Sequence, residues 1–238
     1  VHLSVVEMGD RMVPRMMGPT AGGMIRDWCE AKGIEVFTGT RVESIEPGEP
    51  LNVKLSNGTT KQADLVVSAA GVRPAIGFLE HSGITCLLGV LTDEHLQTNV
   101  PGVFAAGDCA EAFDKVSGKT IVSAIQPNAS EQARIAATNM VAFARGKPAQ
   151  ADLSGVTQIN VLDTLGLVSA SFGDWQGKPG HDHVELTDKA TGRHLSLRFQ
   201  DDVMVGCNAV GWTEHIGVMR GLVEGQIKLG EWKDKLMQ

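Results

Sequence analysis

The sequence predicts an α/β fold followed by a small α+β domain. Three observations support this prediction. The first third places apolar, strand-like runs around a helix-like stretch, and the middle holds a long alanine-rich helical stretch. The last third alternates strand-like runs with polar turns before two short helical stretches. The 238 residues, of which 42% are hydrophobic, are enough for two or three packed cores.

The first predicted segment, residues 1–72, opens with a strand and a helix. The apolar run 1–6 predicts a strand that ends at Glu7. A helix should follow, with Thr20 as its N-cap and with apolar residues on one face. Gly33 stands where a left-handed residue commonly ends a helix.

The rest of this segment predicts strands. Residues 34–38 form one, and period-two alternation around a turn at Asn57-Gly58 predicts a small antiparallel meander. Residues 63–71 read as a buried strand. Strand, helix, strand, meander and strand is the order found in the second half of a Rossmann-type nucleotide-binding domain.

Two further segments complete the predicted organisation. Segment 73–148 should contain a short strand at 103–108 and a helix over 130–144. Segment 149–238 should be an α+β domain with an antiparallel sheet and two terminal helices. Its expected strands lie near Ile159, Val168, Val184, Leu195 and Val203, and its expected helices span 213–224 and 229–236.

Composition excludes several classes of protein. The net charge of −7, without a block of basic residues, argues against a nucleic-acid partner. No apolar stretch approaches the roughly 20 residues that span a bilayer, so we expect no membrane segment and a cytoplasmic location. The four cysteines are far apart and are expected to be buried free thiols. His181 and His183 are expected to be solvated and not to ligate a metal.

Two positions could contact a nucleotide. Glu7 stands where a dinucleotide-binding fold places a carboxylate against the adenosine ribose, and its charge would favour NAD over NADP. The alternative is a solvated strand end. Gly71 ends the expected strand 63–71, where it can adopt a positive φ; the alternative is an ordinary exit into a loop.

The run from Thr98 to Asp108 is the strongest signal for a site. A short strand there should deliver small residues and then Asp108, whose carboxylate can accept a hydrogen bond from a polyol hydroxyl. The amides of Gly107 and Asp108 could face a phosphate. The helix after Pro127 would direct its positive N-terminus toward a bound group such as a flavin carbonyl.

Three collinear motifs carry a family resemblance. Residues 5–15, 69–74 and 98–108 are similar, in order and spacing, to motifs of the pyridine nucleotide-disulfide oxidoreductase flavoproteins. The chain most resembles the branch of NADH:rubredoxin reductase and the nitrite reductase large subunit. The resemblance covers residue 1 to about residue 148, while the C-terminal segment resembles that branch by pattern alone.

The resemblance implies an assignment of residues to cofactors. Glu7 would meet the NAD ribose and Gly71 would lie near the nicotinamide nucleotide. Asp108 would hold the ribityl chain of FAD, and Gln126 and Pro127 would lie beside the flavin ring. On this assignment, residues 1–72 are the second half of an NAD-binding domain and residues 73–148 the C-terminal segment of an FAD-binding domain. Residues 149–238 are then an interface domain that contacts an acceptor or forms a homodimer.

The implied activity is hydride transfer from NADH to FAD, followed by electron transfer to an acceptor such as a small redox protein. The glycine-rich turns that open both nucleotide sites are not in the sequence, so we expect a fragment of the enzyme. One alternative is a cofactor-free module for interaction or dimerisation. Another is a disulfide or CoA-persulfide reductase whose cysteine lies upstream. No catalytic residue is assigned.

Overall fold

The computed structural model describes residues 1–114, 117–155 and 158–237. It divides into two compact units. The first unit joins Val1–Ala69 to Ile159–Gln238, and the second is Ala70–Gln158. The division into domains 1–72, 73–148 and 149–238 stays a prediction.

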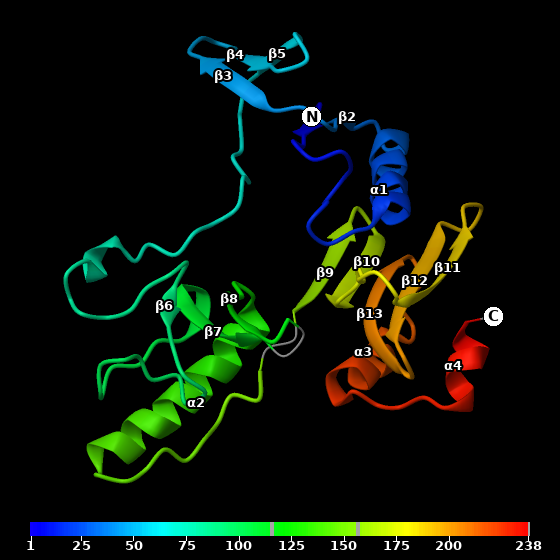
Figure 1. Ribbon diagram of the computed structural model, residues 1–238. Helices are drawn as coiled ribbons and strands as arrows, with labels where there is room; N and C mark the ends of the chain where they lie inside the picture. The colour runs from blue at the N-terminus through cyan, green and yellow to red at the C-terminus, as the bar shows by residue number, and fades with distance from the viewer. Residues whose placement is uncertain (115–116, 156–157, 238) are drawn as a thin grey trace. The chain divides into compact units, whose positions relative to one another are not determined.

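The first unit begins with a parallel pair of strands and the helix between them (Figure 1). Strand β1 spans Ser4–Val6, helix α1 spans Pro19–Ala31 and strand β2 spans Glu35–Phe37. The expected N-cap at Thr20 is wrong, because the cap is Gly18 and Pro19 occupies the start of the helix. Proline suits that position since its missing N–H has no helical partner there. Gly33, with φ of 81°, follows the helix as expected.

The predicted meander is confirmed. Strands β3 (Val42–Glu46), β4 (Leu51–Leu55) and β5 (Thr60–Ala63) form an antiparallel sheet in that order. The strand expected at 63–71 is wrong: β5 ends at Ala63 and the following residues form no ladder. Leu65 and Val67 are each 77% exposed. A strand needs a neighbour to pair its backbone groups, and the described part of the chain supplies none here.

A five-stranded antiparallel sheet forms the C-terminal part of the first unit, as expected. Its strand order is β11-β12-β13-β10-β9. The strands are β9 (Ile159–Thr164), β10 (Leu167–Gly173), β11 (Asp182–Asp188), β12 (Arg193–Gln200) and β13 (Val203–Val210). Helices α3 (Ile216–Gly225) and α4 (Glu231–Leu236) follow. A core that includes Phe172, Leu197 and Phe199 lies on one face of the sheet and packs against both terminal helices.

Helix α1 lies on the other face of the sheet. Because side chains alternate along a strand, Asn208 and Val210 of β13 point away from the core that holds Cys207. Val210 packs with Ile25 of α1 in a second apolar cluster. The indole Nε1 of Trp28 also donates to the carbonyl of Thr164 at 2.9 Å. These contacts join segments of the first unit that are far apart in sequence.

The second unit combines a small sheet with one long helix. Strands β6 (Val90–Leu91), β7 (Ala110–Asp114) and β8 (Lys119–Val122) form the sheet. Helix α2 spans Gln126–Ala144 and begins four residues before the expected start, and the short 3-10 turns η1 and η2 span Gly77–Leu79 and Gly107–Cys109. The continuous strand expected at 103–108 is wrong, because this stretch forms one isolated bridge from Phe104 to Gln97 and then η2.

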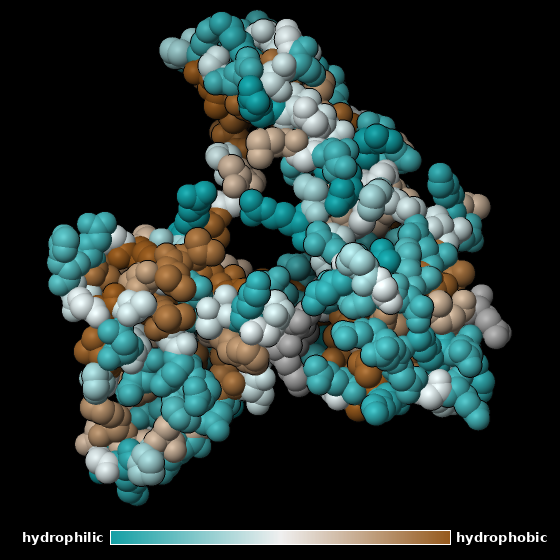
Figure 2. All heavy atoms as spheres, viewed as in Figure 1, coloured by the Kyte–Doolittle hydropathy of each residue, from teal (hydrophilic) through white to brown (hydrophobic). Residues whose placement is uncertain are grey.

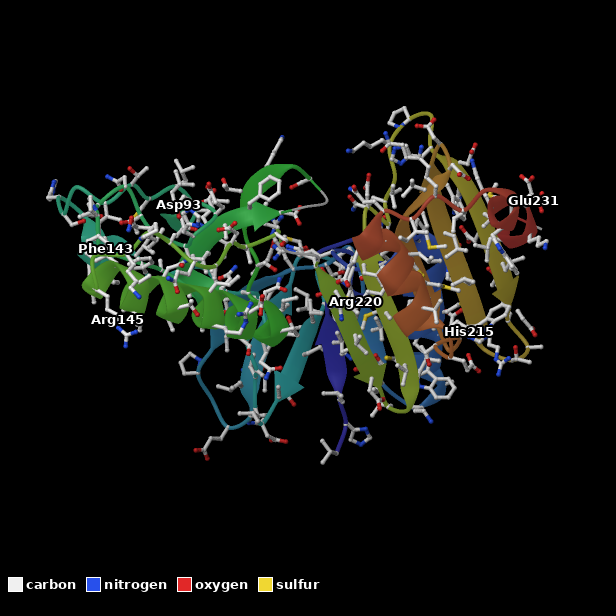
Figure 3. The ribbon with its side chains drawn as sticks, turned by 90° about the horizontal axis from the view of Figure 1, so that it is seen from below. Asp93, Phe143, Arg145, His215, Arg220 and Glu231 are labelled. Atoms are coloured by element: carbon white, nitrogen blue, oxygen red, sulfur yellow. The ribbon has the colours of Figure 1, made fainter. Side chains whose placement is uncertain are left out.

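Helix α2 packs on the small sheet through Ile135 and Ala136, which join Leu96 and Ala112 in the core of the second unit. At its C-terminal end, Phe143 (Figure 3) lies edge-on to Phe104, with ring centroids 6.4 Å apart. Figure 2 shows apolar side chains on the visible surface of the chain. Among the described residues, no helix has both the length and the apolar character needed to cross a bilayer.

Candidate functional site

The predicted Gly107–Asp108 site is a tight turn fixed against helix α2. Gly107 is buried and has φ of 78°, in the left-handed region that side chains rarely adopt. Its N–H donates to Oε1 of Gln132 at 2.8 Å. Because Gln132 is only 1% exposed, this hydrogen bond fixes the turn to the buried face of α2. Asp108, the next residue, is exposed.

Gly107 is required for its backbone conformation more than for space. A Cβ built at this position would lie 3.5 Å from Cβ of Ala129, which is ordinary van der Waals contact. The positive φ would nevertheless strain any residue with a side chain. Ala129 belongs to the first turn of α2, so the turn lies beside the N-terminal part of that helix.

Helix α2 starts at Gln126 and Pro127, both of which are exposed. Ile125 is the N-cap and supplies no capping side chain, and the first turn contains no acidic residue. The partial positive charge of this helix end is therefore not offset by a carboxylate of the helix itself. The structure thus brings four of the six predicted site residues, Gly107, Asp108, Gln126 and Pro127, to one end of α2.

Gly71 and Glu7 are the other two predicted site residues. Gly71 is exposed with φ of 95°, as its predicted backbone role requires, and no hydrogen bond among the described residues joins it to the Gly107 turn. Glu7 belongs to the first unit and follows β1. Its Oε1 accepts the N–H of Gly9 at 2.7 Å, which shapes the loop after the strand. Within the described chain its Oε2 makes no hydrogen bond and can accept one from a ligand.

The second unit also buries polar side chains that the sequence does not single out, Glu111 and Gln132 among them. Glu111, 4% exposed, accepts through Oε2 the N–H groups of Leu88 at 2.8 Å and Gly89 at 3.0 Å. Its Oε1 accepts the hydroxyl of Thr120 at 3.3 Å. These contacts hold a hairpin, so Glu111 has a structural role. Gln132 could have been found from its helical spacing to Ile135 and Ala136, which places all three on one face.

The expectations for cysteine and histidine are partly wrong. Cys29 and Cys207 are buried, but Cys86 is half-buried and Cys109 is exposed beside Asp108 in η2. The ring of His181 is also shielded, since its side chain is only 8% exposed. No group of three or more His, Cys, Asp or Glu side chains among the described residues could hold a metal ion.

Comparison with known proteins places this geometry in a family. The family model described as pyridine nucleotide-disulphide oxidoreductase matches residues 1–137. The epsilon subunit of an NADH-dependent phenylglyoxylate dehydrogenase from Aromatoleum evansii is 31% identical over 223 residues, which cover 93% of this chain and 52% of that protein. The ferredoxin--NAD(+) reductase component of the biphenyl dioxygenase system of Paraburkholderia xenovorans is 29% identical, with coverages of 96% and 54%.

The fold agrees with these matches. A NAD-dependent persulfide reductase from A. fulgidus superposes with a TM-score of 0.85 at 22% identity, covering 97% of this chain and 46% of that one. This likeness supports the predicted α/β fold. The chain spans about half the length of the curated relatives it matches. It belongs to the pyridine nucleotide-disulphide oxidoreductase family.

Proposed function

We propose that the chain is part of an FAD-dependent oxidoreductase that takes hydride from NADH and delivers electrons to a small redox protein. The observation that carries this proposal is the exposed Asp108 on a glycine turn that is fixed to the uncapped N-terminus of α2. Membership of the family supplies the class of chemistry.

The residues of the second unit fit FAD. The carboxylate of Asp108 can accept hydrogen bonds from the ribityl hydroxyls, and the turn that carries it is held rigid by Gln132. Gln126 and Pro127 stand at the positive end of α2, where that end can stabilise negative charge on a neighbouring ring. When bound, the flavin supplies hydride acceptance and electron transfer, while the protein supplies binding and orientation.

The first unit fits NADH. Glu7 keeps one carboxylate oxygen on Gly9 and leaves the other for a ribose hydroxyl. A phosphate on that ribose, as in NADPH, would meet the like charge of Glu7, so NADH is the proposed donor. Gly71, which belongs to the second unit, is also proposed to lie near the nicotinamide nucleotide.

The proposal extends to the electron acceptor, the cellular location and the oligomeric state of the enzyme. Relatives named as reductases of ferredoxin and rubredoxin support a small redox protein as the acceptor. We place the enzyme in the cytoplasm, and assign residues 149–238 to contact with the acceptor or with a second copy in a homodimer.

The test is the flavin content of an Asp108→Ala variant, made in the natural protein at its full natural length because the 238 residues cover about half of the relatives. Losing hydrogen bonds to a charged acceptor should weaken FAD binding by about 10- to 100-fold. Asp152→Ala is the control, since Asp152 is exposed in the same unit. Equal flavin absorbance in both variants after gel filtration would refute the assignment of Asp108. A natural protein without flavin absorbance that ignores added FAD and NADH would favour a cofactor-free interaction module.

A further inference from the structure

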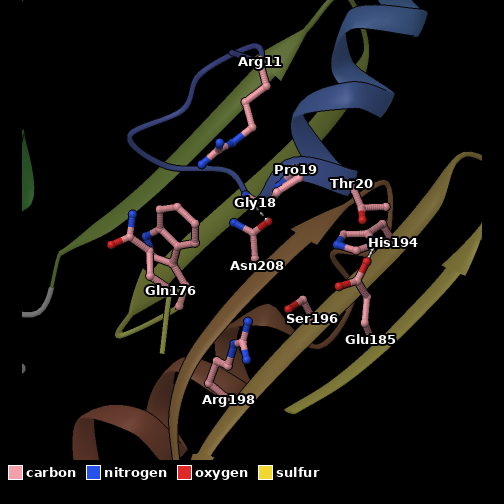
Figure 4. A pocket seen from close by; sticks show the side chains of 11 residues that line it. Arg11, Gly18, Pro19, Thr20, Gln176, Glu185, His194, Ser196, Arg198 and Asn208 are labelled. Carbon is pink, nitrogen blue, oxygen red and sulfur yellow. Dashed lines mark hydrogen bonds and ion pairs between the residues drawn. The ribbon is translucent and has the colours of Figure 1, made fainter. Parts of the chain in front are cut away.

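The first unit contains a polar pocket that the proposed function does not use. It has a volume of about 260 Å³ and lies between the face of the sheet that α1 covers and the chain leading into that helix (Figure 4). Drug-sized ligand pockets measure about 300–1,000 Å³, so this one suits a smaller molecule and excludes a dinucleotide.

Strand alternation explains why one wall of the pocket is polar. Glu185, Ser196 and Asn208 are register partners across β11, β12 and β13, so their side chains share one face of the sheet. Asn208 ties this face to the facing chain, because its Nδ2 donates to the carbonyl of Met16 at 2.7 Å and its Oδ1 accepts the N–H of Gly18 at 3.3 Å. The pocket is therefore part of a fixed interface within this unit.

Two guanidinium groups line the pocket. Arg11 is held in place, since its Nε donates to the carbonyl of Met17 at 2.8 Å and its Nη1 pairs with Asp10 at 2.7 Å. Arg198 points into the pocket from β12 (Figure 4). Its Nε is buried and makes no hydrogen bond within the described chain. A buried charged donor without a partner is costly, and such a group calls for a ligand, an ion or a water.

The N-terminus of α1 forms another part of the wall. Gly18, Pro19 and Thr20 all line the pocket, and the cap at Gly18 provides no side-chain acceptor for the first turn. No acidic residue lies in that turn. The partial positive charge at the start of this 13-residue helix therefore faces the same space as the guanidinium groups.

His194 adds a buried donor or acceptor. It is 1% exposed, and its Nδ1 lies 2.9 Å from the hydroxyl of Thr187. Its ring points into the pocket (Figure 4), and its Nε2 has no hydrogen-bond partner among the described residues. Burial lowers the pKa of His194, which favours the neutral ring, and a neutral ring can offer an N–H without adding charge. The carboxylate of Glu185, 3.9 Å from Nδ1, is the acidic side chain of the lining.

We propose that this pocket binds a small organic or inorganic oxyanion, a carboxylate or a phosphate, at a site separate from those proposed for FAD and NADH. The oxyanion is held by Arg198, by the N-terminus of α1 and by the Nε2–H of His194. Arg11 lines the side of the pocket that the chain before α1 forms. Arg11 is already paired with Asp10, but no carboxylate of the described chain forms an ion pair with Arg198, so the lining favours an anion over a cation.

The test is calorimetric titration of the purified protein at its full natural length with two probes, inorganic phosphate and sodium benzoate, at constant ionic strength set with sodium chloride. We expect at least one probe to bind with a dissociation constant below about 10 mM. Arg198→Gln should weaken that binding about tenfold, since it removes a charge-assisted contact. The probe that binds distinguishes a phosphate site from a carboxylate site, and either result supports the proposal.

Arg193→Gln is the matched control, because Arg193 lies on the same strand with its side chain 46% exposed and does not line the pocket. It should bind the probe within about twofold of the wild type. His194→Gln keeps a neutral polar side chain and serves as the second variant if Arg198→Gln fails to fold; it should also weaken binding. Failure of both probes to bind the wild-type chain, or equal weakening by the Arg193 and pocket variants, would overturn the proposal.

Discussion

Replacing Asn139 with alanine should destabilise the second unit strongly, although the residue lies in the middle of a helix. Its side chain is 2% exposed and makes four hydrogen bonds to the backbone. Nδ2 donates to the carbonyls of His95 at 3.0 Å and Ala151 at 2.7 Å. Oδ1 accepts the N–H groups of Gln150 at 2.8 Å and Ala151 at 3.0 Å. One amide thus joins α2 to two other segments of the unit.

The size of the effect follows from those four contacts. A hydrogen bond contributes about 0.5–1.5 kcal/mol net, so four amount to about 4 kcal/mol. Alanine has a higher helix propensity than asparagine, and this difference stabilises the variant by about 0.5 kcal/mol. We expect the free energy of unfolding of the second unit to fall by about 3.5 kcal/mol in Asn139→Ala.

Urea unfolding measures the loss of unfolding free energy, and hydrogen exchange shows which part of the unit is destabilised. The amides of Gln150 and Ala151 should lose their protection in the variant. Ser130→Ala is the control, because it truncates an exposed polar side chain on the same helix. It should change the free energy of unfolding by less than about 0.5 kcal/mol. A loss below about 1 kcal/mol in Asn139→Ala, or unchanged protection at Ala151, would refute the reasoning.

Two further predictions concern titration and thiol reactivity. Burial lowers the pKa values of His183 and His194 below 6.5, so the unfolded chain binds protons there that the folded chain does not. The free energy of unfolding should therefore be highest above about pH 6.5 and fall as the pH decreases below it; an unchanged slope in His194→Gln would contradict this role. Iodoacetamide should alkylate the exposed Cys109 in the folded chain and spare Cys207, because burial raises the pKa of the Cys207 thiol to about 12. Equal alkylation rates of the two thiols, measured by mass spectrometry, would contradict the burial of Cys207.

The existence of helix α2 was predictable from the sequence, but the residues of its buried face were not. Its alanine-rich composition and the break at Gly146 predict a helix, and the structure confirms one that ends at Ala144. Ile135, Met140 and Val141 all stand in helical register in the sequence, yet Ile135 is buried while Met140 and Val141 are each 51% exposed. The buried face carries polar residues, Gln132 and Asn139 among them, whose partners are backbone groups distant in sequence. Composition alone cannot reveal such partners.

The two wrong strands, at 63–71 and 103–108, fail for a related reason. Their small and apolar residues satisfy the local preference for a strand. A strand also needs paired neighbours, and pairing is not encoded locally. The described residues place no ladder along 64–71, and 103–108 obtains a single bridge at Phe104. The five C-terminal strands formed as predicted because consecutive hairpins supply most of their neighbours within a short stretch of chain.

Strand β12 carries residues of the proposed anion site on its polar side. Its alternation, with Leu195, Leu197 and Phe199 between polar residues, predicts a half-buried strand whose polar side faces water. The apolar side is buried, and the polar side is covered as well, by α1 and the chain before it, which leaves His194 1% exposed and Nε of Arg198 buried. Burying polar groups costs free energy unless they find partners, and Asn208 finds its partners in Met16 and Gly18. Nε of Arg198 is buried and finds no partner within the described chain, so the stability lost by burying it is best explained by a ligand that the pocket binds.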